Sequence, residues 1–276
     1  MFDLKKIPFF DALPMGVCKF STLKENLIQC RAVSRIPEKA ESVIVVLFPY
    51  YLGEEYYNER NISKYAVPAD YHKVCGEYLE KITTHLKAKY KENQFVYFCD
   101  NSPINEVKAA CLAGLGVKGD NSLLINEIYG SFCFIGEIVT DLKIEVNAFE
   151  EKSCLKCGAC KLKCHCEAIS ECGVIKEKCL SEITQKKGEL TEEEGALVLE
   201  GGSVWGCDVC QDVCPMNRNV KPTPIKEFFA NAKPNYKNSC DYKEDRAFYW
   251  RKQDVIERNL RIITKNNYCK NDKNQL

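Results

Sequence analysis

Two groups of closely spaced cysteines constrain this chain more than any other feature of its sequence. The first group has the spacing C-x2-C-x2-C-x3-C and consists of Cys154, Cys157, Cys160 and Cys164. The second has the spacing C-x2-C-x3-C before Pro215 and consists of Cys207, Cys210 and Cys214. Such compact spacing lets the backbone wrap one corner of an iron–sulfur cubane while successive thiolates bind different irons. We therefore expect this region to bind iron–sulfur clusters.

The division of these cysteines between two clusters follows from their order. In two-cluster ferredoxins the fourth cysteine of such a run binds the other cluster. The second group is one ligand short, and Cys179 is best placed to complete it. We expect one [4Fe-4S] cluster to be held by Cys154, Cys157, Cys160 and Cys214. We expect the other to be held by Cys164, Cys179, Cys207 and Cys210.

Two alternatives remain open in this region. Zinc sites also use C-x2-C pairs, although zinc usually takes them as separated pairs and the x2, x2, x3 run favours a cubane. His165 stands where cubane-binding runs carry proline, so the turn loses rigidity and gains an N–H donor. Cys166 lies close enough to Cys164 to replace it as a ligand, but only Cys164 keeps the x3 spacing.

Composition narrows the class of protein. The chain has 39 lysines and arginines and 39 aspartates and glutamates, so no overall charge draws it to nucleic acid or membrane. Its first residues contain acids and prolines instead of an export signal, and its longest apolar run, residues 42–52, is too short to span a bilayer. We expect a cytoplasmic protein without a membrane segment, whose thiols stay reduced.

Hydrophobic periodicity predicts a mixed fold. Strands are expected near residues 42–50, 94–99 and 131–142, and amphipathic helices over residues 71–92 and 105–116. This alternation indicates an α/β (α+β) core at residues 1–150. A cysteine-rich domain is expected at 151–220, with an acidic spacer that includes a short helix, and a helical tail at 221–276.

One apparent motif is misleading. The segment GLGVKG (residues 114–119) matches the dinucleotide-binding pattern G-x-G-x-x-G. That pattern binds pyrophosphate only when a strand precedes it and a helix follows. Here a helical pattern precedes it and a strand-like segment, DNSLLIN, follows, so nicotinamide binding is not expected.

Several segments together resemble the epoxyqueuosine reductase family. They are KYAVPADYHKV, the run from Asp100 to Leu142, the two cysteine groups, KCLSEITQKKGEL and GCDVCQDVCPMNR. In addition, WRKQDVIERN resembles the W-R-x6-R-N segment that opens the C-terminal helical repeats of that family. This chain ends after the first helix of those repeats.

The resemblance implies a cobalamin-binding core like that of reductive dehalogenases, joined to a ferredoxin-like domain with two [4Fe-4S] clusters. It implies reduction of epoxyqueuosine to queuosine in tRNA, with clusters reducing cobalamin and flavodoxin or ferredoxin as the external electron donor. A monomer is expected. The alternatives are a corrinoid-dependent, dehalogenase-like reductase that acts on a small molecule and a non-catalytic iron–sulfur electron-transfer protein.

Asp100 matches the proton-donating aspartate of the family. It ends the apolar strand VYFCD, where its carboxyl would face a cleft. We expect burial beside an apolar corrin to raise its pKa, which would keep it protonated for donation. The alternative is a structural role, because DNSPINE also reads as the capping segment of a helix that begins near Pro103.

The resemblance implies further site residues on less specific grounds. The cofactor-contacting positions it suggests are Arg31, Leu124, Ile135, Ser181 and Asp208. Tyr71 and His72 lie in a matching segment, but a pair that opens a helix is often structural, and no catalytic histidine is required. A basic surface for tRNA phosphates would be formed by Lys186, Lys187, Arg218, Arg251, Lys252 and Arg258.

Overall fold

Four antiparallel strands form the main sheet. They are β1 (Met15–Lys19), β2 (Ser42–Pro49), β3 (Phe95–Cys99) and β6 (Cys133–Thr140), in the order β1-β2-β6-β3. Every residue of β2 is buried, which explains why its sequence, SVIVVLFP, is almost continuously apolar. The computed structural model describes residues 2–146 and 149–271, with the backbone alone described for 265–271.

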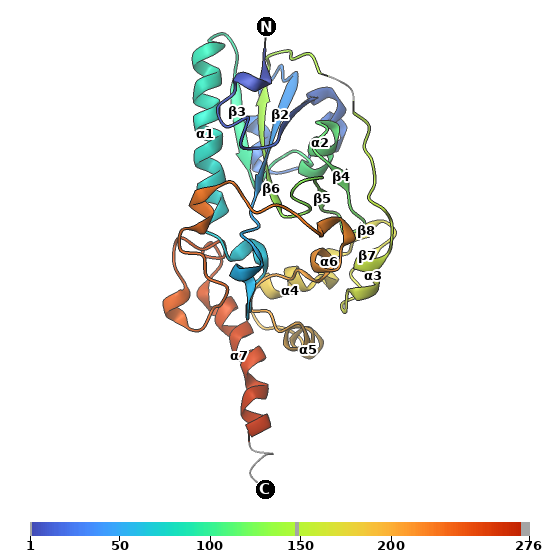
Figure 1. Ribbon diagram of the computed structural model, residues 1–276, viewed down its shortest axis with the longest axis vertical. Coiled ribbons are helices and arrows are strands. Elements are labelled where there is room, and N and C mark those ends of the chain that lie inside the picture. The colour runs from blue at the N-terminus through green and yellow to red at the C-terminus, as the bar shows by residue number, and fades with distance from the viewer. Residues whose placement is uncertain (1, 147–148, 272–276) are drawn as a thin grey trace. The chain divides into compact units, whose positions relative to one another are not determined.

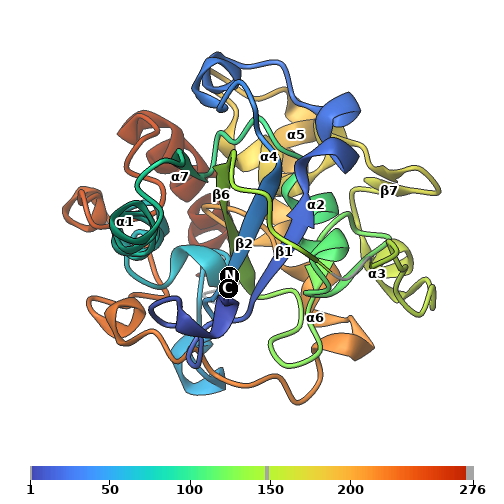
Figure 2. The same cartoon turned by 90° about the horizontal axis from the view of Figure 1, so that it is seen from above.

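Helices cover both faces of this sheet. Helix α1 (Tyr71–Lys89) and helix α2 (Glu106–Leu112) lie on opposite sides of it (Figures 1 and 2). Successive residues of β2 alternate between the faces. Val43, Val45 and Leu47 pack in the apolar cluster that includes α2, while Phe48 lies near Leu79 of α1. The apolar cluster that includes α2 also contains two of the candidate site residues, Leu124 and Ile135.

The chain divides into two compact units, each built from separate segments. The first unit comprises residues 1–51, 71–156 and 216–227, and the second comprises residues 52–70, 157–215 and 228–276. The first contains the main sheet, α1, α2 and the short hairpin of β4 (Val117–Lys118) and β5 (Leu124–Ile125). The second contains most of the cysteine-rich region.

The second unit is mainly helical. Its elements are α3 (Ala159–Lys163), β7 (Ile169–Ser170), β8 (Gly173–Val174), α4 (Leu180–Gln185), α5 (Glu192–Gly201), α6 (Val209–Asp212) and α7 (Gln253–Asn271). Helix α5 begins with a capping box, in which Thr191 and Glu194 each accept a hydrogen bond from the other's backbone N–H. Helix α7 packs against α4 and α5.

Short 3₁₀ helices connect these elements. They are Leu4–Lys6, Phe20–Thr22, Lys24–Asn26, Arg31–Arg35, Glu54–Tyr57, Lys64–Ala66, Lys176–Lys178, Pro215–Asn217, Lys226–Phe229 and Ser239–Asp241.

The sequence-based elements are confirmed with small changes at their ends. The three expected strands are β2, β3 and β6, and the two expected helices are α1 and α2. The acidic spacer contains α5. Strand β1 was not expected, because MGVCK is short and shows no alternation. The GLGVKG segment follows α2 and contains β4, so it lacks the strand-then-helix setting of a dinucleotide site. None of the described helices is long and apolar enough to cross a membrane.

Candidate functional site

Asp100 directly follows β3 and has an unusual backbone conformation. Its φ is +60°, and that of Asn101 is +44°, so two consecutive residues lie in the left-handed region. Asp and Asn tolerate this region better than other non-glycine residues, but each still carries a cost of about 1 kcal/mol or more. Strain of this kind is concentrated at functional sites. The sharp turn directs the Asp100 carboxylate toward the start of α1.

Two side chains from the first turn of α1 hold this carboxylate. Tyr71 donates its hydroxyl to Asp100 Oδ2 at 2.9 Å, and His72 Nε2 lies 3.1 Å from the same oxygen. Asp100 Oδ1 accepts the backbone N–H of Asn101 at 2.8 Å. The Tyr71 ring is stacked on His72 at 4.0 Å and on Phe134 at 4.1 Å between centroids. This stacking fixes the direction of the Tyr71 hydroxyl.

These contacts reverse the expected protonation of Asp100. The hydrogen bond from His72 is the largest influence and, with those from Asn101 and Tyr71, it lowers the pKa of Asp100 from 3.8 to about 2, despite partial burial. The expectation of a raised pKa is therefore wrong for this arrangement, because hydrogen bonds to the charged form outweigh desolvation. The capping alternative is also not observed, since Asn105 is the N-cap of α2.

Sequence reasoning did not recognise the roles of Tyr71 and His72. Their only signal was their position in a segment that resembles the family. The 29 positions between Tyr71 and Asp100 are bridged by the packing of α1 on β3 and β6, which no local pattern reports.

Two further acids lie close to Asp100 in the first unit. Glu106 is the first residue of α2, and burial together with the charge of Asp100 raises its pKa to about 8. Glu137 is fully buried in the middle of β6, where its cross-strand partners are Val45 and Phe98. Both partners belong to the apolar cluster under α2. Burial, followed by the charge of Glu106, raises the pKa of Glu137 well above 4.5.

Glu137 is an isolated polar side chain in a hydrophobic core. Neither of its carboxylate oxygens has a hydrogen-bond partner among the described residues. The Ser102 hydroxyl lowers the pKa of Glu137, but by less than burial and Glu106 raise it. A charged carboxylate in such a place would be very costly, so burial strongly favours the protonated form of Glu137.

Three of the predicted ligands of the second cluster come together in the second unit. Cys164 is the C-cap of α3, Cys179 is the N-cap of α4, and Cys207 directly precedes the N-cap of α6. All three pack against one apolar cluster that includes Leu180 and Ile183. Cys164 and Cys207 are 43 positions apart in the sequence, yet they contact the same apolar surface. Two ligands of one iron–sulfur cluster must lie close together in this way.

Two of the remaining predicted ligands lie on neighbouring helices of the second unit. Cys160 is in α3 and Cys210 in α6, and these two helices pack together. Cys154, in the first unit, is held by a hydrogen bond from its backbone N–H to Lys118 O at 2.9 Å. Among the described residues, no three His, Cys, Asp or Glu side chains converge on a position for a single metal ion. Thiolates that bind different irons of a cubane are spaced more widely than the ligands of one ion.

The region around His165 bears on the choice between Cys164 and Cys166. Cys166 is buried in the apolar cluster, whereas Cys164 is only partly buried and its sulfur accepts the N–H of Ala168 at 3.4 Å. This difference supports Cys164 as the ligand. The His165 ring lies near Gly201, where an added Cβ would be 3.4 Å from its Nε2. That nitrogen is buried and has no hydrogen-bond partner among the described residues.

The suggested cofactor contacts of the first unit differ in burial. Leu124 in β5 and Ile135 in β6 are 4% and 9% exposed and belong to the same apolar cluster as α2. Arg31 is exposed at the start of a 3₁₀ helix, and its carbonyl accepts the Ser34 hydroxyl at 3.0 Å. Arg35, in the same helix, instead donates to Tyr97 O of β3 at 2.9 Å.

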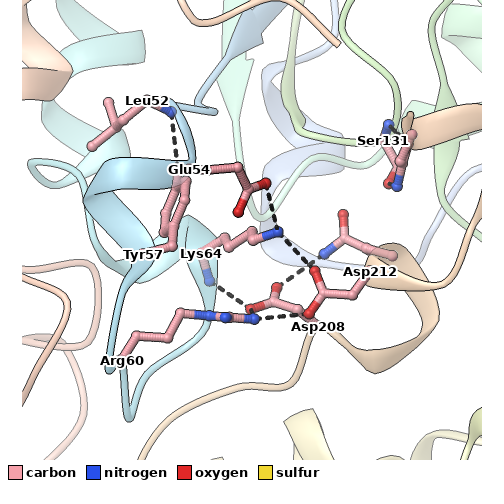
Figure 3. Close-up of polar contacts among 10 residues, drawn as sticks. Leu52, Glu54, Tyr57, Arg60, Lys64, Ser131, Asp208 and Asp212 are labelled. Carbon is pink, nitrogen blue, oxygen red and sulfur yellow. Dashed lines mark hydrogen bonds and ion pairs between the residues drawn. The ribbon is translucent and has the colours of Figure 1, made fainter. Parts of the chain in front are cut away.

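The two suggested contacts of the second unit have other partners. Ser181 lies in α4, where its carbonyl accepts the Thr184 hydroxyl and the Gln185 amide. Asp208 is buried, and burial raises its pKa to about 6. Its oxygens accept hydrogen bonds from Lys64 N, Arg60 and Gln211, so the whole carboxylate is used inside the unit. Figure 3 shows the cations around it.

One expected member of the basic tRNA surface is wrongly assigned. Arg258 is 4% exposed, and its guanidinium donates to the carbonyls of Lys186 (2.8 Å) and Gly188. It therefore stabilises the turn after α4 instead of presenting charge to solvent. Its neighbour Asn259 donates to the carbonyls of Thr184 and Val204 at 2.7 and 2.8 Å.

Comparison with known families gives two matches. Residues 31–101 match the sequence model described as "Epoxyqueuosine reductase QueG, DUF1730". Residues 153–217 match the "4Fe-4S double cluster binding domain". The second match contains all eight cysteines that were assigned as ligands and supports two [4Fe-4S] clusters over zinc.

Individual relatives agree with these matches. The chain is 37% identical over 203 residues to an epoxyqueuosine reductase of Cyclobacterium marinum, covering 72% of this chain and 65% of that protein. It is 34% identical to an epoxyqueuosine reductase of Leadbetterella byssophila, covering 76% and 69%. An epoxyqueuosine reductase solved with a tRNA-Tyr epoxyqueuosine-modified stem loop has the same fold, with a TM-score of 0.74, 23% identity, and coverage of 91% and 76%.

Proposed function

The chain belongs to the epoxyqueuosine reductase family, and from this we propose that it reduces epoxyqueuosine to queuosine in tRNA. The observation that carries the proposal is the constellation of Asp100, Tyr71 and His72 at the end of β3. It joins a strained carboxylate, a phenol and an imidazole in the unit that matches the family. The solved relative that contains a modified tRNA stem loop supports tRNA as the substrate.

Two kinds of cofactor serve this reaction in the proposal. The eight assigned cysteines hold two [4Fe-4S] clusters, and the shared packing of Cys164, Cys179 and Cys207 fits such a group. Cobalamin, when bound, supplies the reducing chemistry at the epoxide carbon. Leu124 and Ile135 would contribute to the apolar wall facing it, and Arg31, Ser181 and Asp208 remain family-based proposals for its contacts.

Asp100 has a specific role in this proposal. At neutral pH its carboxylate is ionised, so it does not store a proton by itself. His72 shares a hydrogen bond with it, and a proton held at His72 Nε2 can pass through Asp100 Oδ2 to the alkoxide that forms when the epoxide opens. Tyr71 keeps Oδ2 oriented for this transfer. A substrate that excludes water from Asp100 would raise the pKa of this carboxyl, which helps it to hold the proton during the transfer.

The cellular setting is proposed on the same grounds. We expect a monomer in the cytoplasm that takes electrons from an external carrier such as flavodoxin or ferredoxin. The chain spans 65% of the length of the Cyclobacterium relative.

The test is complementation of a strain that lacks epoxyqueuosine reductase. Expression of this chain should convert epoxyqueuosine in tRNA to queuosine, measured by mass spectrometry of digested tRNA. Asp100→Asn should abolish the conversion while clusters and cobalamin remain bound. Glu80→Gln, on the exposed face of α1, is the matched control and should convert normally.

Three results would contradict the proposal in different ways. Absence of conversion by a cofactor-loaded wild-type chain would favour a small-molecule substrate. Failure to bind cobalamin would favour an electron-transfer protein. Full conversion of epoxyqueuosine by the Asp100→Asn variant would show that the Asp100 carboxyl is not needed for the reaction.

A further inference from the structure

Four charged side chains form a connected network in the second unit. Arg60 donates to Asp212 Oδ2 at 2.9 Å and to Asp208 Oδ2 at 3.3 Å (Figure 3). Lys64 donates its Nζ to Asp212 Oδ1 at 2.8 Å and its backbone N–H to Asp208 Oδ2 at 2.7 Å. Two cations from residues 52–70 thus meet two carboxylates from the second cysteine group.

The carboxylates of this network alternate with the proposed cluster ligands. Asp208 directly follows Cys207, and Asp212 lies between Cys210 and Cys214. The short helix α6 carries both Cys210 and Asp212. Any group bound by Cys207 and Cys210 is therefore close to two negative charges along the chain.

The network is buried on one side and reaches solvent at Asp212, whose side chain is 36% exposed. The side chains of Asp208 and Lys64 are 1% and 7% exposed, and that of Arg60 is 25% exposed. A cavity of about 170 Å³ borders Arg60, Asp208 and Cys207. Glu54 also approaches Lys64 at 4.0 Å, but its side chain is 78% exposed and is screened by water.

Stability alone is a weak reason for such an arrangement. Removing charges from water costs several kcal/mol per ion, and apolar residues of similar volume often stabilise a protein as well. The carboxylates have a stronger effect on a neighbouring cluster. A cubane bound by four thiolates is already anionic, and its reduction adds one more negative charge, so two unpaired carboxylates beside it would make reduction harder.

We propose that Arg60 and Lys64 are positioning residues that set the reduction potential of the cluster bound by Cys207 and Cys210. Their two positive charges cancel the two negative charges of Asp208 and Asp212, and they hold those carboxylates in place. This keeps the cluster reducible by a one-electron carrier. The inference rests on the clusters of the proposed function.

The test is a potentiometric titration of the anaerobic holoprotein with dithionite and redox mediators, followed by EPR of the reduced clusters. Arg60→Gln should lower the potential of one of the two clusters, because an uncompensated carboxylate remains beside it. Asp212→Asn should raise it, because a negative charge is removed. The double variant should return close to the wild-type value.

Two further variants separate charge from packing. Arg60→Lys keeps the positive charge and should restore the potential, which a purely structural role of the guanidinium would not predict. Lys186→Gln breaks the exposed ion pair with Glu194 (2.7 Å) in the same unit and should leave both potentials unchanged. If Arg60→Gln fails to assemble its clusters, the upward shift in Asp212→Asn still decides the question.

The possible failures can be told apart. A wild-type holoprotein without EPR signals of reduced cubanes would overturn the proposed function and this inference together. Two intact clusters whose potentials are the same in the wild type, Arg60→Gln and Asp212→Asn would overturn this inference alone.

Discussion

Glu137 makes a quantitative prediction about stability and pH. In the folded chain it is buried in β6 and its pKa is raised well above 4.5, while in the unfolded chain it ionises with a pKa near 4.5. Above pH 4.5 the folded state therefore binds one proton more than the unfolded state. The free energy of unfolding then falls by about 1.4 kcal/mol for each pH unit, until the raised pKa of Glu137 is reached. Glu137→Gln has the same shape, carries no charge and lacks this dependence.

The expected effect is large enough for a simple assay. Between pH 5.5 and 7.5 the stability advantage of Glu137→Gln over the wild type should grow by about 1.4 kcal/mol for each pH unit that lies below the raised pKa of Glu137. For a protein of this size about 1 kcal/mol shifts the melting temperature by roughly 2–4 °C. The two melting temperatures, measured anaerobically with clusters intact, should therefore separate by roughly 3–6 °C for each such pH unit. Groups that do not interact with Glu137 cancel in the comparison.

A matched variant controls for removal of a carboxylate as such. Glu80→Gln changes an exposed acid of α1, and its melting temperature should run parallel to that of the wild type. A difference between Glu137→Gln and wild type that stays constant from pH 5.5 to 7.5 would refute the reasoning. Lower stability of Glu137→Gln at pH 7.5 would mean that Glu137 is charged and paired in the folded protein.

Three other predictions follow from local geometry. Cys164→Ser should lose one cluster and Cys166→Ser should keep both, measured by iron content and EPR; the reverse result would make Cys166 the ligand. Thr191→Ala removes the capping box of α5 and should lower the free energy of unfolding by about 1 kcal/mol in a thermal unfolding assay. No change would mean that the box does not stabilise α5. Gly16→Ala should lower the free energy of unfolding by roughly 1–3 kcal/mol or more, because the new Cβ would collide with Ala113 O in the turn that ends α2. An unchanged melting temperature would contradict that packing.

Local patterns were sufficient for much of the fold. The apolar run SVIVVLFP predicts β2 because a strand buried on both faces needs apolar residues at every position. The periodicity of residues 71–92 predicts α1, and Gly114, with φ of +75°, directly follows the C-cap of α2. The acidic start and the threonine cap of α5 are likewise local signals. Each depends on neighbours within a few residues.

Other features depend on contacts between distant segments. The pairing of β6 with both β2 and β3 makes the sheet antiparallel, which alternation of strands and helices does not reveal. The two compact units are assembled from separate stretches of the chain, and the domain boundaries expected at 150 and 220 stay a prediction. Strand β1 is defined by its pairing with β2 more than by its own sequence.

The candidate site divides in the same way. Cysteine spacing by itself predicted iron–sulfur clusters and a set of ligands for them, because wrapping a cubane is a local demand on the backbone. Only the tertiary structure brought Tyr71 and His72 to Asp100 and lowered its pKa, placed Glu137 without partners in the core, and turned Asp208 toward Arg60 and Lys64. Electrostatic environment is set by whatever packs nearby in space, and those neighbours lie up to 148 positions away in the sequence.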